Sequence, residues 1–198
     1  NQLEFEKTIE EFNKIEDARD QLWDRARVLI EKGFEIEAYI LILATWNFAW
    51  FRYDMKKFDL RKFHEVIVKI NPRFKKLESK QFEGIDFTDN VLIEDIKFIY
   101  DQLKQIAKQT GATKIMALKN SNLFVMWDTE IRRINGIKNE GDADEYIKFL
   151  KKMRDDFSSI KWNSRIKPLA KAIDEYNYVI VDEIREKRKI KLKQKTLG

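Results

Sequence analysis

Apolar side chains recur at helical spacing along the first quarter of the chain. Between residues 4 and 31 they stand three or four positions apart, which places them on one face of an α-helix. Residues 38–51 then form a run of fourteen without a charged side chain. A bilayer requires about 20 apolar residues, so we expect no membrane segment. The pattern predicts one or two amphipathic helices that end at Gly33, followed by a buried central helix over about residues 35–53.

The later segments also favour helices, and capping residues mark their starts. Asp59 is placed to cap a helix that runs to Ile70 and stops at Asn71-Pro72, because proline interrupts helices. A cap at Thr88 or Asp89 starts the next one. That helix runs over about residues 90–108. Further helices are expected over residues 112–118, 123–134, 142–157, where Asp142 is the cap, and 164–191. The last of these is opened by Ser164 and carries Ile166 on its inward face.

No segment alternates polar and apolar side chains clearly enough to predict a strand. We therefore expect an all-α fold, with a single helical domain over residues 1–184 and a basic tail over residues 185–198. Hydrophobic side chains make up 43% of the 198 residues, which excludes disorder over most of the length. Six glycines and two prolines are too few for the many turns of an all-β protein.

Composition also restricts the chemistry. The chain has no cysteine and one histidine, so we expect no disulfide, no metal centre and no cofactor. No secretion signal is evident at the start of the sequence, and we expect an intracellular, cytoplasmic protein. The charged fraction of 37% suits a thermophile.

Positive charge is concentrated at the C-terminal end. Residues 185–195 carry seven cationic side chains and one acidic side chain, while the whole chain has a net charge of +5. The rest of the chain is therefore close to neutral. A basic arm is typical of segments that bind nucleic acid or a partner protein, but it also suits a solvated helix end where cations complement the helix dipole.

A single carboxylate directly follows an apolar run in the second half of the chain. Residues 123–127 are all apolar, and Asp128 follows them. Partial removal from water raises the pKa of a carboxyl and strengthens its field on a bound group, so Asp128 is a candidate catalytic residue. It also stands where a helix N-cap belongs, shortly before Ile131. Both interpretations stay open at this point.

Residues 106–134 resemble the core of the helix-hairpin-helix DNA glycosylase superfamily. In that family a hairpin of the form L-P-G-x-G-x-K-T-A leads through a helix to an apolar stretch and an essential aspartate. With Ala112 on the alanine of the motif, Asp128 falls on the aspartate without a gap, and Leu123 begins the apolar stretch. The resemblance implies an α-helical DNA-repair enzyme that hydrolyses the N-glycosidic bond of a flipped damaged or mismatched base.

The segment departs from the family pattern in its hairpin. The two hairpin glycines fall on Ile106 and Lys108, so we expect Gly111 to supply a different turn. The lysine that forms a Schiff base in bifunctional members falls on Thr110, which implies the monofunctional branch. Lys114 lies one helical turn further along. Thr110 and Lys114 are therefore secondary candidates for the same pocket.

The resemblance also implies residues that hold the DNA and the base. Amides near Gly111 and the side chains of Arg132 and Arg133 are candidates for phosphate contacts. Arg52, at the end of the helix predicted over residues 35–53, reaches either a phosphate or simply the surface. Candidates for the base pocket are Trp46, Asn47, Trp50, Phe51 and Trp127. Aromatic side chains at this spacing equally fit plain core packing, and a buried amide such as Asn47 is either a structural strut or a ligand contact.

The last residues resemble part of a peptide that docks archaeal replication and repair proteins on the sliding clamp. Gln194 and Leu197 match its Q-x-x-L half, and the aromatic pair that follows in the peptide is absent. The similarity implies that the natural chain continues past Gly198, although an ordinary lysine-rich terminus explains the same residues. The alternative to an enzyme is thus a non-catalytic helical adaptor that binds duplex DNA or the clamp through residues 185–198.

Overall fold

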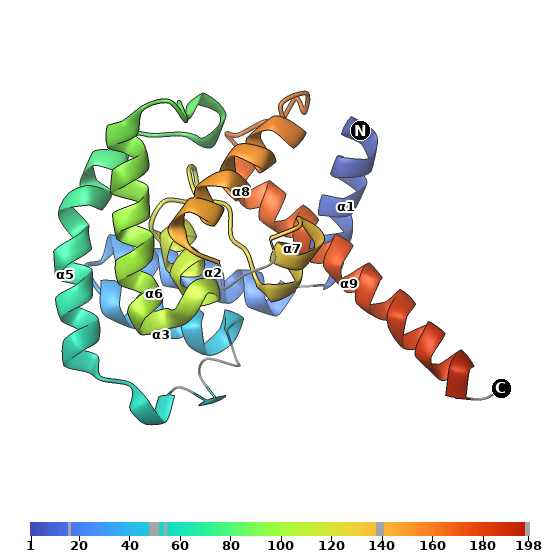
Figure 1. Ribbon diagram of the computed structural model, residues 1–198, viewed down its shortest axis with the longest axis horizontal. Coiled ribbons are helices and arrows are strands. Elements are labelled where there is room, and N and C mark those ends of the chain that lie inside the picture. Colours follow the sequence, from blue (N-terminus) through green and yellow to red (C-terminus); the bar gives the residue numbers. More distant parts are fainter. Residues whose placement is uncertain (16, 48–51, 54, 138–140, 197–198) are drawn as a thin grey trace.

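The computed structural model describes residues 1–15, 17–47, 52–53, 55–137 and 141–196, and it is all-helical over them (Figure 1). The helices are α1 (Gln2–Ile15), α2 (Asp17–Glu31), α3 (Glu35–Trp46), α5 (Leu60–Leu77), α6 (Asn90–Lys119), α7 (Thr129–Ile134), α8 (Ala143–Asp156) and α9 (Leu169–Thr196), with short 3-10 helices η1 (Met55–Lys57) and η2 (Phe82–Gly84). No strand occurs in this part of the chain. The predicted all-α class is confirmed.

The molecule is built around α6. This helix packs on α2, α3, α5 and α8 and lies among them in Figure 1. Every residue from Gly111 to Leu118 is buried. The prediction of a central helix over residues 35–53 was wrong, because α3 ends at Trp46 and buries only one face, against α2 and α6. Asn47 follows with a non-helical backbone, at φ −131° and ψ 55°.

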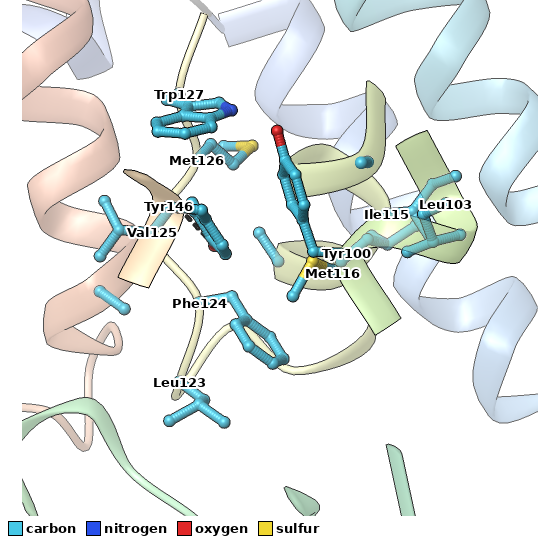
Figure 2. Packing of buried hydrophobic residues seen from close by; sticks show 14 of the residues in the cluster. Tyr100, Leu103, Ile115, Met116, Leu123, Phe124, Val125, Met126, Trp127 and Tyr146 are labelled. Carbon is cyan, nitrogen blue, oxygen red and sulfur yellow. Dashed lines mark hydrogen bonds between the residues drawn. The ribbon is translucent and has the colours of Figure 1, made fainter. Parts of the chain in front are cut away.

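The core beside α6 is rich in aromatic rings (Figure 2). The ring centroids of Tyr100 and Tyr146 are 5.1 Å apart, and those of Trp127 and Tyr146 are 5.0 Å apart. The hydroxyl of Tyr146 donates to the carbonyl of Val125 at 2.9 Å, so its polar end is satisfied inside the core. This bond also fixes the buried segment 123–127 against α8.

The helix caps predicted at Asp59, Asp89 and Asp142 are confirmed. Each carboxylate accepts a backbone N–H in the first turn of the helix that follows it, as capping requires. The predicted stop at Ile70 was wrong, since α5 continues through Pro72 to its end. An internal proline costs about 3 kcal/mol, but the last turn of α5 is retained because side chains beyond the proline, among them Phe74 and Leu77, are buried.

Helix α6 changes direction at Lys108, where φ is 60° and ψ is −178°. A residue with a side chain rarely adopts a positive φ. The turn expected at Thr110-Gly111 was wrong, because Gly111 lies inside the second half of α6. Glycine is needed there for close packing instead: an added Cβ would lie 2.8 Å from the Leu43 side chain and 3.1 Å from the Asn47 amide nitrogen.

The last helix begins later than expected. It starts at Leu169 rather than Ser164, because the carbonyl of Pro168 accepts the first helical N–H. Ile166, which was expected to face inward, is 82% exposed. The helix then continues to Thr196 through the predicted start of the basic tail, and its last turns extend away from the body of the molecule (Figure 1). Among the described helices, none is long and apolar enough to span a membrane.

Candidate active site

A pocket of about 240 Å³ opens where α9 passes the start of α7 and the end of α3. Half of its lining consists of residues that carry charged groups, namely Lys114, Asp128, Lys171, Asp174, Glu175 and Arg185. Aromatic rings supply much of the rest: Phe12, Trp46, Trp127 and Tyr178. A cavity that combines planar apolar walls with a few convergent polar groups is typical of a small-molecule or base-binding site.

Asp128 lies at this pocket and caps α7. Its Oδ1 accepts the backbone N–H of Ile131 at 2.7 Å. Its Oδ2 is 3.6 Å from Nη2 of Arg185 on α9, and its side chain is 31% exposed. One oxygen therefore serves the helix, while the other lies at the pocket and pairs with Arg185. The two interpretations of this carboxylate that the sequence left open are compatible with each other.

The segment that delivers Asp128 is extended. The helix predicted over residues 123–134 covers only Thr129–Ile134, and residues 124–128 are not helical. Side chains supply the hydrogen bonds that a helix would have made. The hydroxyl of Thr113 on α6 is 3.3 Å from both the backbone nitrogen and the carbonyl oxygen of Trp127.

Asp174 is a buried acid in the lining of the pocket, and one of its oxygens is unsatisfied. It is 5% exposed, and its Oδ1 accepts the backbone N–H of Met126. Its Oδ2 has no hydrogen-bond partner among the described residues. Burial raises the pKa of Asp174 well above its usual range, which favours the protonated acid. A buried polar atom left unsatisfied beside a cavity indicates a ligand contact.

Lys171 is a buried cation in an aromatic surround. Its Nζ lies 5.1 to 5.3 Å from the ring centroids of Phe12, Trp23 and Trp46, and 3.0 Å from Oε1 of Glu175. Burial alone lowers the pKa of Lys171, but the surrounding carboxylates, with Glu175 first, raise it above its usual value. Lys171 therefore supplies a fixed positive charge rather than a neutral amine.

Three further sequence candidates also reach this pocket. Lys114 is 9% exposed, and its Nζ is 6.0 Å from the ring centroid of Trp46. Trp46 is partly buried and lines the cavity. Trp127 touches the cavity but is 0% exposed and packs on Tyr100 and Tyr146 (Figure 2). Its indole is mainly a core group.

Other sequence candidates lie elsewhere. The lining of this pocket, as far as the chain is described, does not include four of the candidates: Asn47, Arg52, Thr110 and Gly111. Asn47 packs against Gly111 at the crossing of α3 and α6, and Arg52 is exposed. Trp50, Phe51 and Leu197 lie outside the described residues, as does the side chain of Gln194.

The arginines predicted to grip phosphate lie on α7. The guanidinium of Arg132 is 5.5 Å from the ring centroid of Trp127. Nε of Arg133 donates to Glu130 at 3.1 Å, and the pKa of Glu130 is lowered, chiefly by this hydrogen bond. Both arginines belong to α7, the short helix that Asp128 caps.

Sequence reasoning missed the contribution of α9. Along the first turns of α9, charged side chains alternate with the apolar residues of the inward face. The charged residues are Lys171, Asp174 and Glu175, and the apolar ones include Ala170, Ile173 and Tyr178. Buried charged side chains at helical spacing are a signal for a functional site. The signal was available, but nothing local showed which segment these charges would meet.

No protein-family model, curated protein or solved structure matches this chain. Within the described residues, no group of three or more histidine, cysteine or acidic side chains is arranged to hold a metal ion.

Proposed function

We propose that this protein is a DNA-repair enzyme that resembles monofunctional DNA N-glycosylases of the helix-hairpin-helix superfamily. It hydrolyses the N-glycosidic bond of a damaged or mismatched base flipped out of duplex DNA. The observation that supports the proposal is the position of Asp128, which lines a pocket with aromatic walls and buried charges. Its second carboxylate oxygen pairs there with the partly exposed Arg185.

In this mechanism, different residues act on the base and on the sugar. The flipped base enters the pocket and stacks on Trp46 or Tyr178. As the C1′–N bond breaks, its electron pair leaves with the base, and the carboxylate of Asp128 stabilises the positive charge that develops on the sugar. A water molecule held by Asp128 attacks C1′ and gives its proton to that carboxylate.

The buried charges act on the departing base. The Lys171 ammonium offsets the negative charge that the base acquires, because electrostatic interactions are strong in a site removed from water. Asp174 in its protonated form donates a hydrogen bond to the base edge. The same two groups therefore favour both binding and departure of the base.

The test is release of free base from a panel of duplexes that carry single lesions or mismatches. We expect the full chain to release at least one base, and Asp128→Asn to lower that release by about 10²–10³-fold. The monofunctional assignment adds that borohydride reduction traps no covalent complex through Lys114. A wild-type protein that releases no base from any duplex of the panel contradicts the proposal.

A second candidate function is a non-catalytic adaptor that binds DNA or the sliding clamp through residues 185–198. The projection of the last turns of α9 from the body favours it (Figure 1). Under this alternative, deletion of the arm removes all binding and Asp128→Asn has no effect.

A further inference from the structure

Two arginines of α9 are held by two acids at the start of α7. Nη2 of Arg185 is 3.6 Å from Oδ2 of Asp128, and Nη1 of Arg188 is 3.4 Å from Oε2 of Glu130. The arginine side chains are 40% and 47% exposed. Ion pairs this open to solvent contribute little to stability. Either arginine can therefore exchange its acid for a stronger anionic partner.

The two arginines continue the face of α9 that lines the pocket. Asp174, Tyr178 and Arg185 line it, and Arg188 follows one turn later. The opposite face of α9 carries Lys187, which lies in a groove against α1 and pairs with Glu183 at 3.1 Å. Arg185 and Arg188 thus lie toward the pocket, and Lys187 lies on another face of α9.

The pair between Arg185 and Asp128 conflicts with catalysis by Asp128. A guanidinium beside the carboxylate competes with a positively charged sugar for the same oxygen. The unsatisfied Oδ2 of Asp174 in the same pocket independently indicates a ligand there. A ligand that fills the pocket and also carries anions would resolve the conflict.

We propose that Arg185 and Arg188 bind two neighbouring phosphates of the strand that carries the flipped nucleotide, and that this exchange releases Asp128 from Arg185. The identity of the ligand as DNA rests on the proposed function. The two arginines are three residues apart, or about 4.5 Å along the helix axis, so their guanidinium groups lie on the same side of α9. Flexible guanidinium groups at this spacing reach adjacent phosphates, which they bind in bidentate geometry.

The exchange couples DNA binding to the state of Asp128. Coupling between two sites is reciprocal, so a change that weakens the hold of Asp128 on Arg185 strengthens the hold of Arg185 on phosphate. Asp128→Asn removes the charge and retains an N-cap. This variant therefore binds DNA more tightly while it loses base release.

The first experiment measures binding of the full chain to a duplex with a tetrahydrofuran abasic-site analogue, by fluorescence anisotropy over a series of salt concentrations. We expect Arg185→Gln and Arg188→Gln each to weaken binding and to reduce the slope of log K against log salt by about 1. Lys187→Gln removes the same charge from the other face of α9 and is expected to reduce the slope by less than half as much. Equal slopes for Lys187→Gln and Arg185→Gln overturn the proposal.

The second experiment is a double-mutant cycle on the same duplex. Asp128→Asn tightens binding severalfold in the wild-type background and leaves it unchanged in the Arg185→Gln background. Equal tightening in both backgrounds overturns the exchange, since it would reflect only the loss of a negative charge near DNA. Equal or tighter binding to duplex RNA of the same sequence overturns the choice of DNA.

These measurements do not depend on base release. If the slopes and the cycle behave as expected and no base is released from any lesion, the enzymatic function fails and the phosphate exchange stands. If base is released but the cycle shows no coupling, the exchange fails and the enzymatic function stands.

Discussion

Two aspartates of the pocket occupy opposite environments. Asp128 is partly exposed beside the guanidinium of Arg185. Asp174 is 5% exposed, and one of its oxygens lacks a hydrogen-bond partner among the described residues. Burial raises the pKa of Asp174 and so favours its protonated form. The structure therefore pairs a carboxylate suited to a developing cation with an acid suited to donate a hydrogen bond.

The environment of Asp174 predicts how stability depends on pH. Because burial raises its pKa in the folded state, the unfolded chain ionises first as pH rises above about 4, and the wild type loses stability from there up to the folded pKa. Asp174→Asn keeps an acceptor for the N–H of Met126 and cannot ionise. We expect this variant to melt at a higher temperature than the wild type near about pH 8, and the difference to vanish near about pH 4.

Thermal unfolding of both proteins at steps of pH checks this expectation. Asp144→Asn is a control of opposite sign, since its hydrogen bond with Lys97 lowers the pKa of Asp144 and its ionisation therefore favours the folded state above about pH 4. A wild-type advantage over Asp174→Asn that grows with pH would contradict the assignment.

At the residue scale, the sequence reveals a feature where its signal is local. Asp128 stands out because an apolar run leads directly to it. Asp174 does not, because its role depends on a hydrogen bond to Met126, which is 48 residues away in the chain. A contact of this kind is set by how α9 packs on the extended segment, and the pattern of one segment cannot reveal it.

At the scale of elements, periodicity and caps located the helices, and tertiary packing decided their ends. The cap at Asp142 was read correctly because capping is a local interaction. Pro72 and Gly111 were read as helix breaks by their intrinsic preferences. Both lie inside helices, because the burial of Phe74 and the approach of α3 to α6 outweigh those preferences.

The helix crossing at Gly111 yields a stability prediction. In Gly111→Ala, the added Cβ lies 2.8 Å from side-chain carbons of Ala107 and Leu43. We expect the overpacking to cost about 1–3 kcal/mol and to outweigh the gain of about 1 kcal/mol in helix propensity. Urea unfolding measures the difference. Gly84→Ala is the matched control, because nothing lies within 4 Å of an added Cβ there, and equal stability losses in the two variants would contradict the crossing.

At the scale of the whole molecule, composition and apolar spacing were enough to predict the fold class, but they did not predict how the helices are arranged. Scarce glycine and proline with regular apolar spacing predict helices. An amphipathic face does not specify its partner, so the position of α6 at the centre and the convergence of α3, α7 and α9 on one pocket emerged only from the structure. The continuity of α9 joins this pocket to the basic arm.

That continuity makes the two proposed roles of α9 separable by truncation. Removal of residues 189–198 leaves every pocket residue in place, since Arg185 is the last that lines it. We expect weaker DNA binding, because a large share of the basic side chains is lost, and an unchanged rate of base release at saturating protein. Anisotropy and single-turnover assays measure the two quantities. Unchanged affinity, or complete loss of base release, would contradict this division.

The central claim is that Asp128 acts on the sugar of a flipped nucleotide. The most direct test is the single-turnover rate of base release by Asp128→Asn and wild type at saturating protein, with unfolding curves for both. We predict a rate lower by about 10²–10³-fold in a variant whose stability is close to that of the wild type, because asparagine also caps α7. Equal rates for the two proteins would contradict the account.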